Sequence, residues 1–215
     1  KFASSGAASA AWGMSYFLLL LLYMLILINS QLVMSSVAEE KTRREADMQI
    51  ASKSPAPLLY GKIAAATETG LLQMALWAGG GLLLTAVSGS PHGAAAANTG
   101  TPDVSSILLG AVTAPELAAF VILFGLGFLQ FSMLFAGIGS LINRTEDLGS
   151  ISMPIVLPVV AGFILAMAAL GTPDASWAVA TSFVPLVSPF VLFARIAMSN
   201  VPLWQIAVAL AINVA

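Results

Sequence analysis

The chain has 215 residues, of which 59% are hydrophobic and only 8% are charged. Soluble domains carry about 25% charged residues, so this composition excludes a water-soluble globular protein and indicates several apolar spans of about 20 residues in membrane lipid. The net charge of −2 comes without a basic stripe, so we expect no nucleic-acid partner, and the lack of cysteine excludes disulfides, thiol catalysis and Cys-ligated metal in these residues.

The first predicted transmembrane span runs from about Met14 to Ser36 and leads into a charged segment at residues 37–62. That segment holds five of the eight Lys and Arg residues and four of the ten acids of the chain: Lys41, Arg43, Arg44, Lys53 and Lys62, with Glu39, Glu40, Glu45 and Asp47. Opposite charges recur at i,i+4 spacing, which stabilises a helix in water by about 0.2–0.5 kcal/mol per pair. We therefore expect the first span to continue out of the membrane as a charged helix to about Ile50. The alternative is a solvated loop that only sets topology, although basic residues alone would be enough for that.

Three further spans are predicted at Ile63–Val87, Pro115–Ile142 and Ile151–Leu170. The turn at residues 143–150 carries Arg144, whereas the loop at residues 88–106 has no Lys or Arg. Basic residues concentrate in cytoplasmic loops. The charged segment and the turn are therefore predicted to be cytoplasmic, and the loop at residues 88–106 is predicted to lie outside.

Residues 176–200 are long enough to cross a membrane, but Pro185 and Pro189 interrupt them and Arg195 lies near their end. Interior proline removes a backbone hydrogen bond and clashes with the preceding turn. We therefore expect a broken re-entrant segment that enters and leaves on the outer side, with Arg195 at the membrane edge.

The last apolar run, Val201–Ala215, begins a fifth visible span. Its length of about 22 Å is shorter than the roughly 30 Å hydrocarbon core, so we expect a C-terminus truncated within this helix. The predicted fold is an all-α polytopic membrane protein with about five visible transmembrane helices and the re-entrant segment.

Three polar residues within the spans are candidates for a substrate path: Glu68, Gln73 and Gln130. A charged side chain deep in lipid costs roughly 3 kcal/mol on insertion scales. Glu68 is therefore expected to face protein or water, in a path or at a subunit contact, unless it is an interfacial acid that reaches back to the cytoplasm. For the two glutamines the alternative is simple helix–helix bonding.

The sequence contains no ATP-binding motif and no predicted metal site. In "APLLYGKI" the P-loop pattern fails, because Ala56 stands where the first Gly is required and Ile63 stands where Ser or Thr is required. The prediction is therefore a protein that is not itself an enzyme and binds no cofactor directly.

Three motifs resemble the ABC-2-type (type V) ABC exporter permeases, in particular the sodium-efflux-permease branch. The first is "VAEEKTRRE…SPAPLLYGKI", similar to the Glu-Glu-Lys run, Ser-Pro step and Gly-Lys helix start of that family. The second is "FLQFSMLFAGIGSLINRTED", similar to its Gly-rich span before a short cytoplasmic turn. The third is "FVPLVSPFVLFARIAMSNVPLWQ", similar to its Pro-Leu-x-Ser-Pro segment, Arg and Pro-x-Trp entry to the final span.

The resemblance implies a multi-pass permease in the bacterial inner (cytoplasmic) membrane that exports a substrate. Its partners would be a nucleotide-binding ATPase that binds ATP and Mg, and a second permease subunit, identical or different. The visible spans would be the second to sixth of the family, with residues 1–13 as the tail of a missing outer domain and residues 14–215 as the transmembrane domain. A coupling helix would lie in the segment at residues 37–62, and we expect ATPase coupling through Glu39, Glu40, Lys41, Arg43, Arg44 and Glu45. The alternative function is a secondary transporter or channel that is driven by an ion gradient and uses Glu68.

Overall fold

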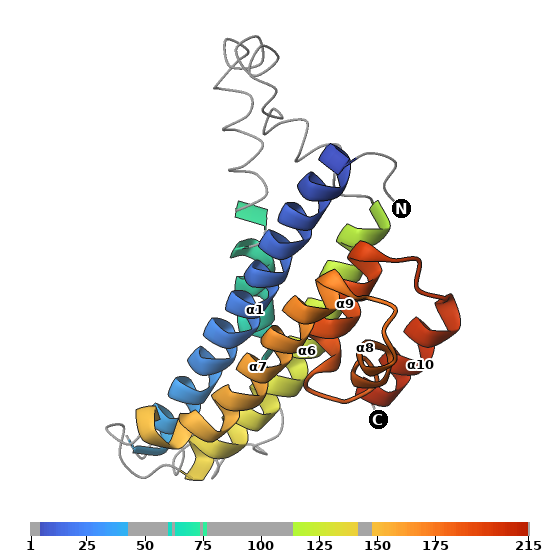
Figure 1. Cartoon of the computed structure of the whole chain (residues 1–215). Coiled ribbons are helices and arrows are strands. Elements are labelled where there is room, and N and C mark those ends of the chain that lie inside the picture. The colour runs from blue at the N-terminus through green and yellow to red at the C-terminus, as the bar shows by residue number, and fades with distance from the viewer. Residues whose placement is uncertain are drawn as a thin grey trace, which may run out of the picture.

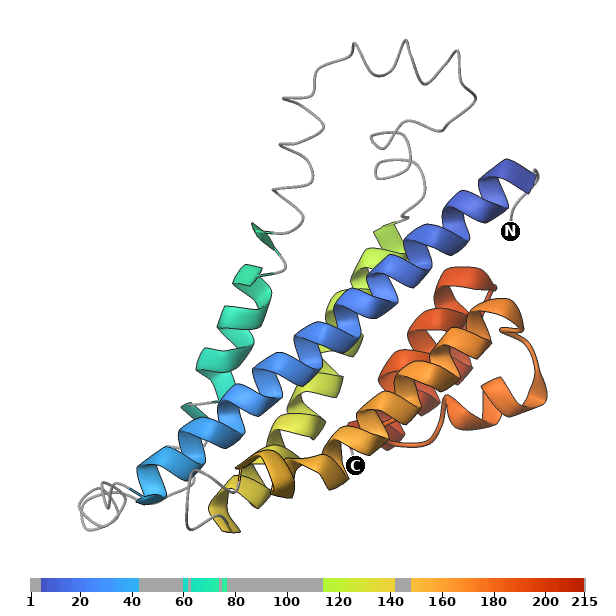
Figure 2. The same cartoon turned by 60° about the vertical axis from the view of Figure 1, so that its left-hand side comes forward.

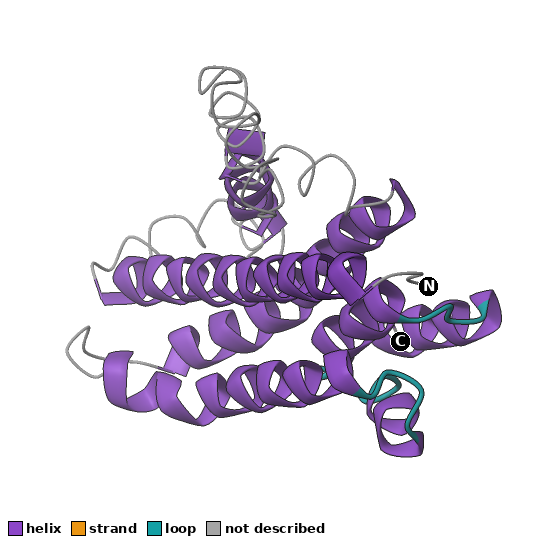
Figure 3. Cartoon of the chain, turned by 45° about the horizontal axis from the view of Figure 1, so that its top comes forward, coloured by secondary structure: helices purple, strands orange, loops and turns teal. Residues whose placement is uncertain are grey.

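The computed structural model describes residues 5–42, 60–61, 63–73, 75–76, 114–141 and 148–214. All regular structure in these ranges is helical (Figure 3), as predicted. The three longest helices are α1 (Ser5–Thr42), α6 (Ala114–Leu141) and α7 (Leu148–Gly171). Each contains an apolar stretch long enough to cross a membrane, at Ala11–Glu40, Pro115–Leu141 and Gly149–Gly171.

The long helices run side by side, and the helical pieces at residues 60–76 lie beside α1 (Figures 1 and 2). α1 and α6 run in the same direction and finish at the same end of the bundle, where α7 begins. A close contact confirms this register, because a Cβ added to Gly139 near the end of α6 would lie 2.8 Å from the backbone oxygen of Met34 in α1. The chain therefore leaves α1 and α6 at one end of the molecule and leaves α7 at the other.

One face of α6 is a row of buried phenylalanines spaced three or four residues apart, which is the period of a helix face. The row consists of Phe120, Phe124, Phe128, Phe131 and Phe135. Two of these rings meet aromatic residues of the short helix α9 (Ser188–Met198): Phe120 lies 5.6 Å from Phe193, and Phe131 lies 6.1 Å from Phe190, between ring centroids. The core of the bundle is thus aromatic and is centred on α9.

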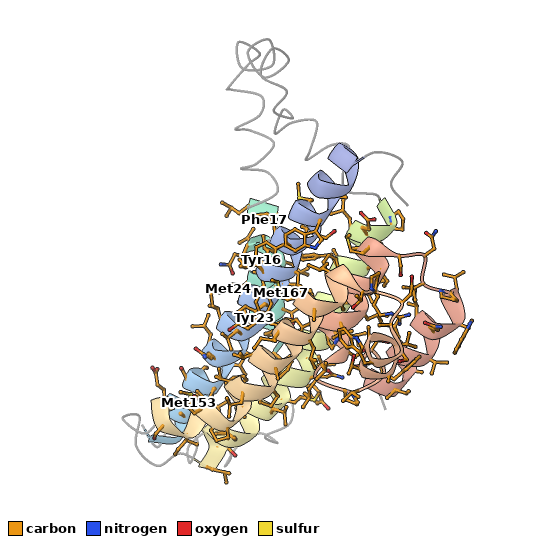
Figure 4. All side chains as sticks on the ribbon, in the orientation of Figure 1. Tyr16, Phe17, Tyr23, Met24, Met153 and Met167 are labelled. Atoms are coloured by element: carbon orange, nitrogen blue, oxygen red, sulfur yellow. The ribbon has the colours of Figure 1, made fainter. Side chains whose placement is uncertain are left out.

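α9 occupies the middle of the bundle, and nine of its eleven residues are buried. Tyr23 of α1 reaches both Phe163 of α7, at 4.7 Å, and Phe190 of α9, at 6.5 Å, whereas Phe17 and Met24 of α1 are exposed (Figure 4). Backbone that starts or ends at membrane depth must be shielded from lipid, since lipid cannot satisfy its polar groups. Burial of α9 on all sides provides that shielding.

The predicted interruption of residues 176–200 is present, with one correction to its position. α8 (Ser176–Thr181) and α9 are separated by residues 182–187, in which Leu186 has a positive φ of 73°. Pro185 lies in this break, but Pro189 lies in the first turn of α9 and begins the helix instead of breaking it. A proline is tolerated there because the N–H that it lacks would have no helical partner. At about 9 and 17 Å, neither helix reaches across a membrane core.

Other predicted boundaries need smaller corrections. α1 begins at Ser5 and ends at Thr42, so it is longer at both ends than the predicted span and runs without a break through residue 13. Of the predicted span at residues 63–87, the described residues are helical, and residues 74 and 77–87 lie outside the described part. The last helix, α10, is Leu203–Val214.

Candidate functional site

The proposed coupling residues Glu39 and Glu40 lie in the last turn of α1. Glu39 is exposed and Glu40 is half-buried. The helix continues to Thr42, so the predicted continuation of α1 is helical at least that far. The side chain of Lys41, and all of Arg43, Arg44 and Glu45, lie outside the described residues.

The three candidates for a substrate path are not brought together. Glu68 is exposed on the helix at residues 63–73. Gln73 on the same helix is half-buried and accepts a hydrogen bond from Asn29 Nδ2 of α1 at 3.5 Å. Gln130 of α6 faces α10 and donates through Nε2 to the Oδ1 and backbone oxygen of Asn213, at 2.9 and 2.8 Å.

Arg195 lies in the last turn of α9 and is 1% exposed, the least exposed charged side chain among the described residues. Its guanidinium donates through Nε to the backbone oxygen of Pro173 at 2.9 Å, through Nη1 to Ser182 Oγ at 2.9 Å and through Nη2 to Gln205 Oε1 at 2.8 Å. One side chain therefore joins the chain after α7, the end of α8, and α10. Burial lowers the pKa of Arg195 from its ordinary value, and the carboxylate of Asp174 acts in the opposite direction.

Arg195 is thus buried among protein atoms near the end of the bundle where α7 finishes, and its place at the membrane edge stays a prediction. A buried charge needs hydrogen-bonding partners, and three neutral acceptors supply them here. The hydrogen bond from Arg195 to Pro173 joins the last turn of α9 to the chain just after α7. The segment at residues 172–200 therefore starts and finishes at the same end of the bundle (Figure 1).

A second polar cluster joins α6, α9 and α10. Asn213 of α10 accepts from Gln130 and donates through Nδ2 to Ser188 Oγ of α9 at 2.9 Å. Gln130 Oε1 is buried and has no hydrogen-bond partner within the described part of the chain. Two further buried oxygens without such a partner there lie next to each other in α1, at Asn29 Oδ1 and Ser30 Oγ.

Sequence reasoning found Arg195 and Gln130 but missed Ser182, Ser188, Gln205 and Asn213. The spacing of polar residues along these two helices could have indicated them, because residues about two turns apart share one helix face. Ser188 and Arg195 are seven residues apart, which is close to two turns, and Gln205 and Asn213 are eight residues apart with Ala209 between them. Among the described residues, no group of three His, Cys, Asp or Glu side chains is placed to hold a metal ion.

The bundle of long apolar helices defines the class of protein: a polytopic all-α membrane protein. The family model for ABC-2 family transporter proteins matches residues 7–215, and the chain belongs to that family. The match assigns residues 7–215 to the membrane part of a transporter of that family.

Two curated relatives match over most of the chain. It is 31% identical to the uncharacterized protein YhaP of Bacillus subtilis over 202 residues, which cover 94% of this chain and 46% of that protein. It is 26% identical to an uncharacterized protein of Methanocaldococcus jannaschii over 186 residues, which cover 86% of this chain and 41% of the relative. The chain thus spans less than half the length of either relative. No solved structure matches it.

Proposed function

We propose that this chain is the membrane-spanning permease of an ATP-driven exporter in the cytoplasmic membrane. A separate or fused nucleotide-binding ATPase would bind ATP and Mg, and a second permease subunit would complete the translocation path. Membership of the ABC-2 transporter family supports the transport role. The observation that carries the coupling mechanism is the unbroken helix from the apolar stretch of α1 to Glu39 and Glu40.

A continuous helix transmits displacement because its backbone hydrogen bonds hold successive turns in register. Near its charged end, α1 is in backbone contact with α6 through Met34 and Gly139. A force applied at Glu39 and Glu40 would therefore move both helices together. Mixed charges at the end of α1 suit a polar groove on the ATPase, where complementary charge fixes register and specificity.

The secondary-transporter alternative receives less support. It needs Glu68 to form an ion site, yet Glu68 is exposed on its helix, and the other polar candidates, Gln73 and Gln130, bond to different helices. An ion site would require several oxygen ligands that converge on one point.

The test is charge reversal at the end of α1. The full-length protein is purified from its native membrane through an affinity tag, with and without Glu39→Lys and Glu40→Lys together. Like-charge contacts across an interface cost several kcal/mol, and about 1.4 kcal/mol already corresponds to tenfold in affinity. We therefore expect at least a tenfold loss of co-purified ATPase, or loss of coupling between ATP hydrolysis and transport. The variant should still insert, since the apolar spans are unchanged.

Asn200→Lys is the matched control. Asn200 is exposed and follows α9 at the opposite end of the bundle, so added charge there should leave ATPase binding unchanged. The proposal fails if the double variant retains its ATPase and its coupling, or if no ATPase accompanies the wild-type protein.

A further inference from the structure

α10 makes a narrow apolar contact with the rest of the described chain, through Ile206, Ala209 and Leu210. Ala209 is the one residue of this helix that is buried there, while Leu203, Trp204 and Val214 are 82%, 63% and 73% exposed. Lipid tails are as apolar as these side chains, so burial gives no strong drive for helices to associate in a membrane, and hydrogen bonds and close packing matter more. The polar contacts of α10 therefore contribute to its attachment alongside this narrow apolar contact.

Those contacts form two rungs between α9 and α10. Gln205, Ala209 and Asn213 follow one another at four-residue intervals and share one face of α10. The first, here called the Arg195 rung, joins Arg195 to Gln205 at 2.8 Å. The second, the Asn213 rung, joins Asn213 to Ser188 at 2.9 Å and also to Gln130 of α6 at 2.8 and 2.9 Å. Because α9 and α10 run in opposite directions, the rungs lie near opposite ends of the pair.

The two rungs differ in which hydrogen-bonding groups would lose their partners if the helices separated. The Arg195 rung is charged and also bonds to Ser182 Oγ and the backbone oxygen of Pro173. Pulling Gln205 away would remove an acceptor from a guanidinium that is 1% exposed, and charge-assisted hydrogen bonds are the strong ones. This rung therefore resists opening.

The Asn213 rung is neutral, and its hydrogen-bonding capacity is incompletely used. Gln130 and Asn213 are both half-buried, and Gln130 Oε1 has no partner among the described residues. Interhelical hydrogen bonds between neutral side chains in membranes are weak, because separated groups find other partners. Separation there would also free Gln130 to use its unpaired oxygen.

We propose that α10 is a hinged helix, fixed at the Arg195 rung and able to open at the Asn213 rung. Opening swings the Asn213 end of α10 away from α6 and α9 and uncovers the polar side chains of Gln130 and Ser188. The hinge is argued from contacts within the described residues, so it does not depend on the proposed ATPase.

Distances between spin labels test the hinge. Labels are placed in a cysteine-free background of the full-length protein, in lipid nanodiscs, at a common reference, Leu157 of α7, and at either Leu203 or Val214 of α10. All three positions are exposed, so the labels disturb no packing. We expect one narrow distance for the 157–203 pair and an additional longer distance for the 157–214 pair. Gln130→Met keeps the size of the side chain but removes its donor, and it should increase the ratio of the longer to the shorter population roughly threefold or more.

Two results would overturn the hinge. A single narrow distance for the 157–214 pair, in both the wild type and Gln130→Met, means that α10 does not open. Equal distance shifts in both pairs mean that both ends of α10 move together and that the Arg195 rung is not a fixed point. If Gln130→Met fails to assemble, the wild-type 157–214 distribution decides by itself, because the open population is expected there as well.

Discussion

The three hydrogen bonds of the Arg195 guanidinium all go to neutral oxygens, and Asp174 acts on it only as a nearby charge. We therefore expect each acceptor to contribute to the stability of the fold. Hydrogen bonds to charged groups contribute about 1.5–3 kcal/mol. We expect Gln205→Leu, which removes the acceptor at 2.8 Å, to lower the free energy of unfolding of the detergent-solubilised protein by that amount in denaturant titration. Gln205→Glu is the control, because it restores an acceptor with opposite charge and should be as stable as the wild type or more so. Equal losses in both variants would mean that the contact contributes nothing specific.

The sequence allowed the prediction that Arg195 belongs to the re-entrant segment but not that it is buried. Its three acceptors lie 10, 13 and 22 residues away along the chain, and all three lie outside α9, so helix periodicity does not reveal them. A backbone oxygen such as that of Pro173 leaves no signal in sequence at all. Ser182 and Gln205 are common polar residues whose role appears only when α8, α9 and α10 are folded together.

The packing of α9 against α7 requires a small residue in α7, Gly162. A Cβ added to Gly162 would lie 2.8 Å from Cδ2 of Phe190, whose ring is fully buried. We expect Gly162→Ala to displace this ring and to lower the free energy of unfolding by about 1–3 kcal/mol.

Gly125 of α6 gives a matched control for this substitution. It is also a helical glycine, but an added Cβ there meets nothing within 4 Å. Gly125→Ala should raise stability by up to about 1 kcal/mol, since alanine is the better helix former. If both alanine variants change stability in the same direction, the packing of Phe190 does not decide the effect.

Helices α6 and α7 could be predicted nearly to the residue because continuous apolar stretches bounded by polar turns fix their limits. The phenylalanine row of α6 was not predicted, although its spacing of three and four residues is present in the sequence. The start of α9 could not be predicted. Pro185 and Pro189 look alike in sequence, and only the fold decides which of them occupies the first turn, where proline costs little.

At the scale of the whole molecule, α7 and α9 finish at the same end of the bundle, opposite the ends of α1 and α6 (Figure 1). With the positive-inside orientation, that end faces outside. Single cysteines at the exposed positions Ser176 and Asn200 should both react with an impermeant thiol reagent added outside intact cells, whereas one at exposed Gly149 should react only after permeabilisation. Labelling of Asn200 only from the cytoplasm would contradict the re-entrant path and reverse the direction of α10.

The unequal lengths of the long helices make the molecule responsive to bilayer thickness. The apolar stretch of α1 has 30 residues and that of α7 has 23, which correspond to about 45 and 35 Å. A helix longer than the roughly 30 Å hydrocarbon core tilts to keep its apolar surface covered, at a cost of fractions of a kcal/mol per Å of mismatch. Because the mismatch is larger for α1 than for α7, we expect a thinner membrane to tilt α1 more and to shift its end at Glu39 and Glu40 along the membrane surface. We therefore expect lipid composition to influence the position of the charged end of α1.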